Sequence, residues 1–256
     1  MERTGAIRRA LLFLLICAPI WGVPNALGAV HPVAPAAALV ALSYFFLRSE
    51  QRSLAVLGLG ASWRRLGEPA ARLAAGLVGG ALLIALVALI VRLVLPVPWA
   101  WNPRFSAGMA AWSLLWFLCG NTVEELVFRG YGFERLIAGL GHWPAQFVTA
   151  LLFALFHVVN GWPWQVALLN TTVGSLLFGL VFVRWRSVPA AVGVHAAANW
   201  VRELLLSDPP TANTLFAPLS PRPRTPGEQL GAMLAMDAVF LVACAALAVS
   251  VSRRPR

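Results

Sequence analysis

The sequence contains few charged residues: only 12% of its 256 residues are Asp, Glu, Lys or Arg, whereas 59% are hydrophobic. A typical soluble domain has about 25% charged residues. A chain of this length has too small an interior to hide so many apolar side chains, and its apolar runs are long and uninterrupted. The shortage of charge therefore argues against a soluble helical protein and favours an integral membrane protein.

Lysine is absent, and all 20 basic residues are arginines, which gives a formal net charge of +10. A strongly basic chain can bind nucleic acid. Here, however, the arginines lie between the apolar runs and do not form one patch. Their distribution is typical of a protein that is oriented in a membrane, and we expect the lipid bilayer and no nucleic acid as a partner.

The sequence also lacks the motifs by which cysteine and histidine usually bind metals. No CxxC and no HExxH motif occurs, and Cys17, Cys119 and Cys244 are far apart in apolar stretches. An odd number of scattered cysteines predicts buried free thiols that act as small apolar residues.

Eight apolar stretches approach the length of a membrane-spanning helix, which is about 20 residues. We predict an all-α polytopic transmembrane bundle of about eight spans that forms one domain over residues 1–256. The second, fifth and seventh stretches are short or polar, which leaves seven spans as the alternative. The stretches are Ala10–Gly28, Val33–Leu47, Ala71–Leu95, Met109–Arg129, Pro144–Val159, Trp164–Val183, Val188–Leu206 and Leu230–Val251.

The arginines distinguish the two sides of this predicted bundle. If the N-terminus lies inside, the outer connections contain mainly Arg104, Arg222 and Arg224. An excess of basic residues marks the cytoplasmic side, so we expect both termini in the cytoplasm and a location in the inner or plasma membrane of a bacterium. The arginines of the inner side are Arg3, Arg8, Arg9, Arg48, Arg52, Arg64, Arg65, Arg72, Arg129, Arg135, Arg184, Arg186, Arg253, Arg254 and Arg256.

The first apolar run and two of the connections allow further predictions. The first apolar run follows Arg3, Arg8 and Arg9 like a signal peptide, but the run is long, no convincing small-x-small cleavage site ends it at once, and seven more spans follow, so we expect a retained helix. Ser53–Gly67 is either a helix on the lipid headgroups or a polar loop. Ser207–Gly227 is rich in proline and is expected to be an irregular extracytoplasmic loop.

Ionisable side chains within the spans are the candidates for function, because each costs about 2.5 to 3.5 kcal/mol on insertion scales. Asp237 in the last span has no role that the sequence explains. The full set is Glu124, Glu125, Arg129, His157, His195 and Asp237, with Arg92 near the end of its span.

The first motif is NTVEELVFRGYGFERL, residues Asn121–Leu136, which we expect to form one helix. Glu125 and Arg129 are four residues apart with the acid first, the favourable order for an ion pair on a helix. Glu124 lies on an adjacent face without a local partner, which makes it the better candidate for chemistry. The structural alternative is that both acids serve one arginine network.

Two histidine motifs follow. Phe153 and His157 share one helix face, and so do His195 and Asn199. The ring N–H of His195 and the amide N–H of Asn199 could bind one oxyanion together. Hydrogen bonding between membrane helices is the structural alternative for both motifs.

The polar groups of the three motifs lie at similar depth. At a rise of about 1.5 Å per residue, Glu124, His157 and His195 lie roughly 13 to 20 Å from the expected cytoplasmic helix ends, and Asn199 lies one turn further. Independent structural residues need not share a depth, so the pattern favours one common site.

Together the three motifs resemble those of the CAAX protease and bacteriocin-processing (CPBP, or Abi) family of intramembrane endopeptidases, which includes the type II CAAX prenyl proteases. The resemblance covers residues 121–199, and the expected span count also agrees with the family's eight-helix architecture. The family motif EExxxR matches Glu124, Glu125 and Arg129, FxxxH matches Phe153 and His157, and HxxxN matches His195 and Asn199.

The resemblance implies a role for each motif residue. Glu124 would be the general base that activates a water together with His157, and His195 and Asn199 would stabilise the oxyanion. Glu125 and Arg129 would brace the site. The substrate would be a membrane-associated protein or peptide, of which prenylated proteins are one class, and it would reach the site through a cavity open to the cytoplasm.

Three alternatives remain open at this stage. Glu124, His157 and His195 are also a familiar zinc ligand set, although the resemblance favours a metal-free reaction without a cofactor. A non-catalytic immunity or scaffold protein could keep the cluster for packing. A small transporter could use buried Glu and His as a proton relay, but the sequence shows no internal repeat or broken helix pair.

Overall fold

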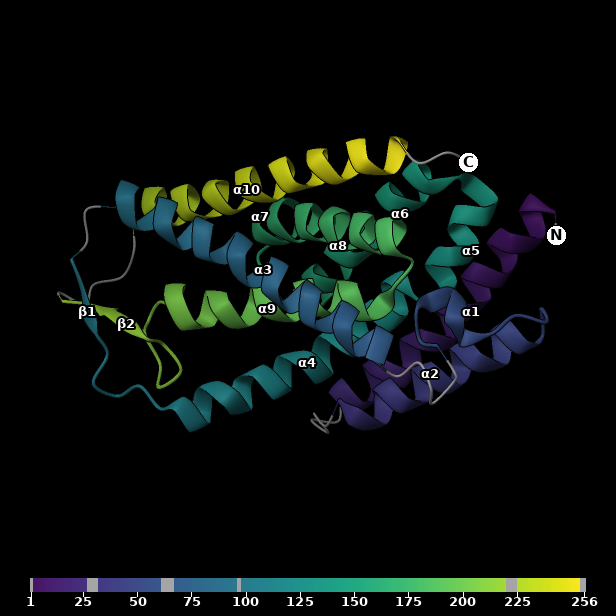
Figure 1. Ribbon diagram of the computed structural model, residues 1–256, viewed down its shortest axis with the longest axis horizontal. Coiled ribbons are helices and arrows are strands. Elements are labelled where there is room, and N and C mark those ends of the chain that lie inside the picture. Colours follow the sequence, from purple (N-terminus) through teal and green to yellow (C-terminus); the bar gives the residue numbers. More distant parts are fainter. Residues whose placement is uncertain (1, 27–31, 61–66, 96–97, 220–224, 254–256) are drawn as a thin grey trace.

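The computed structural model describes residues 2–26, 32–60, 67–95, 98–219 and 225–253. Most of these residues are helical, and the only sheet among them has two short strands. Figure 1 shows that the long helices run roughly along the longest axis, with both termini near one end and the small sheet at the other. Six arginines of the expected charge pattern lie outside the described residues: Arg64, Arg65, Arg222, Arg224, Arg254 and Arg256.

The helices follow the expected apolar stretches, with some breaks. They are α1 (Arg3–Ala26), α2 (Val33–Arg48), the 3-10 turn η1 (Leu54–Leu57), α3 (Gly67–Val94), α4 (Ala107–Arg129), α5 (Tyr131–Leu140), α6 (His142–Val159), α7 (Trp164–Val166), the π-helical turn η3 (Ala167–Thr171), α8 (Thr172–Trp185), α9 (Val188–Leu206) and α10 (Pro226–Ser252). Strands β1 (Trp99–Trp101) and β2 (Phe216–Pro218) pair antiparallel.

Five helical stretches are long and apolar enough to cross a membrane: Arg3–Gly22 of α1, α3, α6, the continuous stretch Trp164–Trp185, and α10. α2 is apolar but has only 16 residues. α4 and α9 are not among these five candidate spans of the described residues. Both helices carry polar motif residues, which lower their mean hydropathy. The structure therefore shows a helical membrane protein, while the number of eight crossings stays a prediction.

Glycines let α3 and α9 pack closely, which places the histidine motif of α9. A Cβ on Gly76 would lie 2.3 Å from the carbonyl oxygen of Ala190, and a Cβ on Gly193 would lie 2.3 Å from that of Leu73. Small residues allow such close approach between membrane helices. α9 begins after Ser187, whose side chain accepts a hydrogen bond from the Ala190 amide.

The segment Asn121–Leu136 is two helices and not the expected single one. α4 ends at Arg129 and α5 begins at Tyr131, with Gly130 between them at φ −77° and ψ −143°. α5 packs against α1, where Gly132 lies next to Phe13. The depth of Glu124 consequently cannot be measured along one helix from Glu134.

The two connections that the sequence singled out both contain short elements of secondary structure. Within Ser53–Gly67, the 3-10 turn η1 forms and Leu57 is buried in it. Residues 61–66 of this segment lie outside the described residues. Within Ser207–Gly227, strand β2 pairs with β1, and the buried Asn102 donates to the carbonyls of Thr211 and Thr214. This connection is thus tied to the segment between α3 and α4.

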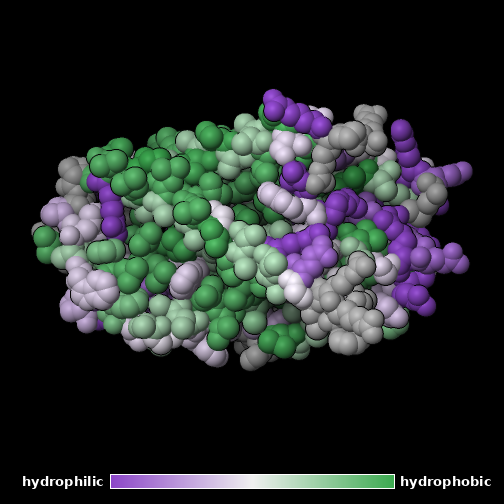
Figure 2. All heavy atoms as spheres, in the orientation of Figure 1, coloured by the Kyte–Doolittle hydropathy of each residue, from purple (hydrophilic) through white to green (hydrophobic). Residues whose placement is uncertain are grey.

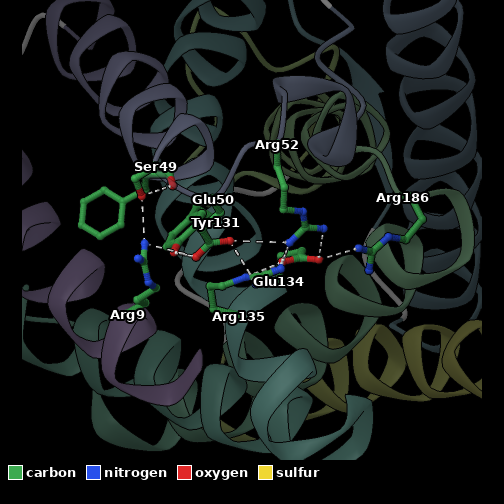
Figure 3. A network of polar contacts seen from close by, with 9 residues as sticks. Arg9, Ser49, Glu50, Arg52, Tyr131, Glu134, Arg135 and Arg186 are labelled. Carbon is green, nitrogen blue, oxygen red and sulfur yellow. Dashed lines mark hydrogen bonds and ion pairs between the residues drawn. The ribbon is translucent and has the colours of Figure 1, made fainter. Parts of the chain in front are cut away.

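Hydrophilic residues gather at the end of the molecule that carries the termini, whereas the face toward the sheet is mostly hydrophobic (Figure 2). A network of ion pairs at that end joins α1, the segment after α2, α5 and the α8–α9 connection (Figure 3). Glu134 accepts hydrogen bonds from Arg52, Arg135 and Arg186. The network therefore holds four separate segments together at the arginine-rich end.

Candidate active site

A fully buried ion pair lies at the base of the site. Glu125 and Arg129 are both 0% exposed, and Arg129 Nη1 donates to Glu125 Oε1 at 3.1 Å, one turn along α4. Arg129 Nη2 also donates to the carbonyl and hydroxyl oxygens of Ser175 on α8, at 3.0 and 2.7 Å. A buried charge needs a partner and hydrogen bonds to offset its desolvation. The structure thus contains the ion pair expected from the first motif, and it links α4 to α8.

Glu125 has a second contact that its spacing to Arg129 does not reveal. His195 Nδ1 on α9 lies 2.8 Å from the same Glu125 oxygen, Oε1. Because a carboxylate only accepts hydrogen bonds, Nδ1 must carry the hydrogen. The ring of Phe178 stacks on the imidazole with centroids 4.2 Å apart. Glu125 and Phe178 together fix the tautomer and the orientation of His195.

The other ring nitrogen of His195 faces two residues of α4. Nε2 lies 3.6 Å from Glu124 Oε2 and 3.2 Å from Asn121 Nδ2. With the amide oriented as in the structure, Asn121 donates to Nε2, which then accepts as in a neutral imidazole. His195 could donate to an oxyanion only with Nε2 protonated and the Asn121 amide turned. The expected oxyanion role therefore requires a change at Asn121.

Asn121 is a polar residue of this site, and the sequence alone predicted no role for it. Its side chain is buried and its Oδ1 accepts a hydrogen bond from Asn199 Nδ2 at 3.3 Å, so it links both residues of the HxxxN motif. The signal was present in the spacing, because Asn121 precedes Glu124 and Glu125 by three and four residues and therefore shares their helix face.

His157 on α6 lies on the wall of the same cavity. Its Nδ1 is 2.8 Å from the carbonyl oxygen of Phe153, so Nδ1 carries the hydrogen and Nε2 is the acceptor of the neutral ring. The rings of Phe153 and Trp162 flank the imidazole, with centroids 4.5 and 5.0 Å away. His157 and Glu124 line the same cavity, and no hydrogen bond joins them in the described structure.

The site opens into a cavity of about 490 Å³ between α3, α4, α6, α8, α9 and α10. Glu124 is the only carboxylate among the described residues of its wall, and the other polar groups include His157, His195 and Asn199. Most of the remaining wall is apolar and aromatic. An apolar cavity in which a small number of polar groups converge is typical of a ligand-binding or catalytic site.

We tested whether these residues fit a zinc ion. Nowhere in the described parts of the chain do three His, Cys, Asp or Glu side chains come together in a way that could hold a metal ion. Glu124, His157 and His195 do not form such a group as arranged. The contact between His195 Nδ1 and Glu125 does not decide the question, because a histidine that binds zinc through one ring nitrogen usually donates the other N–H to a carboxylate. The arrangement of the described side chains therefore gives no support to the zinc alternative.

Asp237 in α10 has a partner on the π-helical turn η3. Asn170 Nδ2 donates to Asp237 Oδ1 at 2.8 Å and to the carbonyl of Met233 at 3.2 Å. Asn170 also lines the cavity. The extra residue of a π-helical turn shifts the side chains that follow, and such turns often occur near functional sites. The contact explains the burial of Asp237 through helix packing, and Asp237 is not a wall residue of the cavity.

Fold and site together define a helical membrane protein with a carboxylate, imidazole and amide cluster at the base of a cavity inside the bundle. A family model described as Rce1-like, "Type II CAAX prenyl endopeptidase Rce1-like", matches residues 106–201, which include all three motifs. This match supports the assignment of the chain to the CPBP family of CAAX-type intramembrane proteases. No curated protein and no solved structure matches the chain.

Proposed function

We propose that this protein is a glutamate-dependent intramembrane endopeptidase that hydrolyses a peptide bond of a membrane-associated protein or peptide. The observation that carries the proposal is the position of Glu124, the one carboxylate on the described cavity wall, 3.6 Å from the Nε2 atom of a fully oriented His195. The neighbouring acid, Glu125, is occupied by Arg129 and His195 and is closed off from the cavity.

The proposed reaction uses a water between Glu124 and His157. Glu124 takes a proton from this water while the water oxygen attacks the carbonyl carbon of the scissile bond, and His157 Nε2 accepts the second hydrogen of the water as a hydrogen bond. The carbonyl oxygen then carries the negative charge. Glu124 returns its proton to the amide nitrogen as the C–N bond breaks, so the enzyme ends in its starting state.

The negative oxygen of the intermediate requires hydrogen-bond donors. Asn199 Nδ2 and, once protonated, His195 Nε2 are the candidates, as both side chains line the cavity. Donors that are already held in place stabilise a developing charge without further reorganisation. Glu125 and Arg129 contribute indirectly, because they hold His195 and Ser175 in position.

The decisive variant is Glu124→Gln, which keeps the size of the side chain and removes the base. We expect it to lower the rate of cleavage of a quenched peptide library, with prenylated members included, by about 10²- to 10⁴-fold, the usual contribution of a general base. Glu68→Gln is the matched control, since Glu68 lies outside this cavity at the arginine-rich end of α3 and is 56% exposed. Both variants would be compared with the wild type in detergent.

A chelator added to the wild type separates the two reaction types. Activity that survives the chelator supports a water activated by Glu124 and His157 alone, and activity that disappears and returns with zinc supports a metal enzyme. Equal cleavage by wild type and Glu124→Gln, or no cleavage by any folded form, would contradict the proposal and favour a non-catalytic membrane protein.

A further inference from the structure

A second cavity lies in the half of the bundle that carries the termini. It is a groove of about 670 Å³ between α3, from Glu68 to Leu86, and the second half of α10, and residues of α8 and α9 complete its wall. Figure 1 shows α3 and α10 diverging toward this end of the molecule. None of the described residues that line the groove also lines the catalytic cavity. This α3–α10 groove is therefore separate from the active site.

Small residues keep the α3–α10 groove open. Ala71, Ala75 and Gly79 line it from α3 at intervals of four residues, so they share one helix face. A Cβ on Gly79 would meet no atom within 4 Å. Ala190 on α9 and Ala243 on α10 line the other sides. The packing of the helices therefore leaves a hollow that these short side chains do not fill.

The groove faces the hydrocarbon of the bilayer. α3 and α10 are both long and apolar enough to cross a membrane, and little of either is buried inside the bundle. Leu82 and Leu86, which line the groove from α3, are 67% and 47% exposed. Figure 2 shows a mostly hydrophobic surface over the middle of α3. Since a spanning helix is surrounded by lipid tails, the molecules that reach this hollow are those of the bilayer.

The length of the groove matches an acyl chain. At a rise of about 1.5 Å per residue, its apolar part extends roughly 22 Å along α3, from Ala71 to Leu86. One leaflet contributes about 15 Å, half of a hydrocarbon core of about 30 Å. An acyl chain that begins at the polar end of the groove and extends through its own leaflet therefore fits within the groove.

The polar end of the groove combines arginines of two helices with a tryptophan. Arg72 on α3 pairs with Glu68 and donates to the carbonyl oxygen of Trp185 at 2.9 Å. Arg184 on α8 donates through Nε to Ser250 of α10 at 2.7 Å. The two arginines together exceed the charge of Glu68, which leaves a net positive charge there. Basic pockets between membrane helices bind anionic headgroups, and tryptophan is enriched at headgroup level.

We propose that the α3–α10 groove binds one anionic phospholipid, with an acyl chain in the apolar part and the headgroup phosphate at Arg72 and Arg184. Both arginines are partly exposed, and a guanidinium group can donate two hydrogen bonds to a phosphate. The bound chain packs against Val194 of α9, the residue before His195. The lipid thus supports the turn of α9 that carries the motif histidine, from a side that the catalytic cavity does not reach.

Lipid binding to the delipidated full-length protein tests this inference. Native mass spectrometry in detergent measures binding of phosphatidylglycerol, which is anionic, and of phosphatidylcholine with the same acyl chains, which has no net charge. Gly79→Leu fills the groove, because its side chain enters the open space there. Gly22→Leu on α1 is the matched control, since a Cβ on Gly22 also meets no atom within 4 Å and Gly22 does not line the groove.

We expect the wild type and Gly22→Leu to bind one phosphatidylglycerol in preference to phosphatidylcholine, and Gly79→Leu to bind it at least tenfold more weakly. The double variant of Arg72→Gln and Arg184→Gln should weaken phosphatidylglycerol binding about 30-fold, at roughly fivefold per arginine, and leave phosphatidylcholine binding unchanged. Arg48→Gln is the control for the arginines, because Arg48 is exposed at the same end and does not line the groove. It should bind like the wild type.

Three results would overturn the inference. Equal binding by Gly79→Leu and Gly22→Leu would show only the unspecific lipid that surrounds any membrane protein. Equal affinity of the wild type for both lipids would show that the arginines do not select an anionic headgroup. A dimer that Gly79→Leu disrupts, without lipid on the wild type, would show that a second copy of the chain fills the groove.

The arginine variants keep the test decisive if Gly79→Leu does not fold, which size-exclusion chromatography and thermal unfolding would reveal. In that case, undiminished phosphatidylglycerol binding by the double variant overturns the inference. Lipid binding needs no hydrolysis, so this result is independent of the Glu124→Gln test.

Discussion

At the residue scale, the site depends on a chain of side-chain contacts that crosses between two helices. Glu125 orients His195 from one side, Asn121 contacts the other ring nitrogen, and Asn199 donates to Asn121. Asn121 thus controls which hydrogen bonds the HxxxN motif can offer to a reacting carbonyl. Its role is that of a positioning residue.

We predict that Asn121→Leu lowers kcat about tenfold with little change in KM, since the loss of one hydrogen bond of about 1 to 1.5 kcal/mol corresponds to roughly that factor. The reason is that the change affects His195 and Asn199, which act on the intermediate more than on the bound substrate. Steady-state cleavage of the best peptide measures both constants.

Asn170→Leu is the control for this prediction. Asn170 is the same residue type on the same cavity wall, similarly buried, but its amide contacts Asp237 and Met233 and not His195. An equal loss of kcat in both variants would indicate a general effect on packing and would argue against the positioning role of Asn121.

The sequence could predict only those contacts that lie within one helix. The spacing of Glu125 and Arg129 predicted their ion pair, and the spacing of the histidine motifs predicted shared faces. The contacts of Ser175, Phe178 and Asn121 with the motif residues connect different helices, and no spacing within a helix encodes how two helices are rotated against each other. The catalytic roles themselves remain predictions.

At the element scale, the contact between α3 and α9 is set by glycines, and α3 contains a natural comparison. A Cβ on Gly76 would lie 2.3 Å from the Ala190 carbonyl oxygen, whereas a Cβ on Gly79, three residues later, would meet no atom within 4 Å. The same substitution at the two positions therefore has opposite expected effects.

We predict that Gly76→Ala destabilises the protein by about 1 to 3 kcal/mol, the usual range for overpacking. Gly79→Ala should be neutral or stabilising by up to about 1 kcal/mol, because alanine favours the helix over glycine. Thermal unfolding in detergent measures both variants. If Gly76→Ala were as stable as Gly79→Ala, α3 and α9 would not pack as closely as the structure shows.

The apolar runs in the sequence predicted most of the elements but not their interruptions. Gly132 of α5, just after Gly130, packs against α1, and Asn170 in the π-helical turn is hydrogen-bonded to α10, so both interruptions lie at contacts between helices. The β1–β2 pair joins segments more than a hundred residues apart, each only three residues long, so no local pattern indicates it.

At the scale of the whole molecule, polarity is divided between the two ends. The arginine-rich end has an ion-pair network in which Glu50 and Glu134 serve several arginines (Figure 3). Burial and the hydrogen bond with Glu50 raise the pKa of Tyr131, which favours the protonated hydroxyl that donates to Glu50. The sequence predicted the excess of arginine at this end, but not the pairing, because the partners come from four distant segments.

The number of crossings is the property of the whole molecule that most needs a test. α4 has 23 residues and α9 has 19, which correspond to about 34 and 28 Å, and both lie within the range of about 17 to 25 residues that membrane-spanning helices use. Their polar residues Glu125, Arg129 and His195 face the bundle interior and are buried. Mean hydropathy counts these residues as if they faced lipid, so it underestimates both helices as spans.

We therefore predict that α4 and α9 cross the membrane, as an eight-span bundle requires. In the cysteine-free protein, single cysteines at Arg104 and Thr211 should react with an impermeant maleimide on one side of the membrane, and those at Trp143 and Arg186 on the other. If α4 did not cross, the cysteines at Arg104 and Trp143 would react from the same side, and if α9 did not cross, those at Arg186 and Thr211 would do so. Either result would separate Glu124 from His195 in depth and would be incompatible with a shared site.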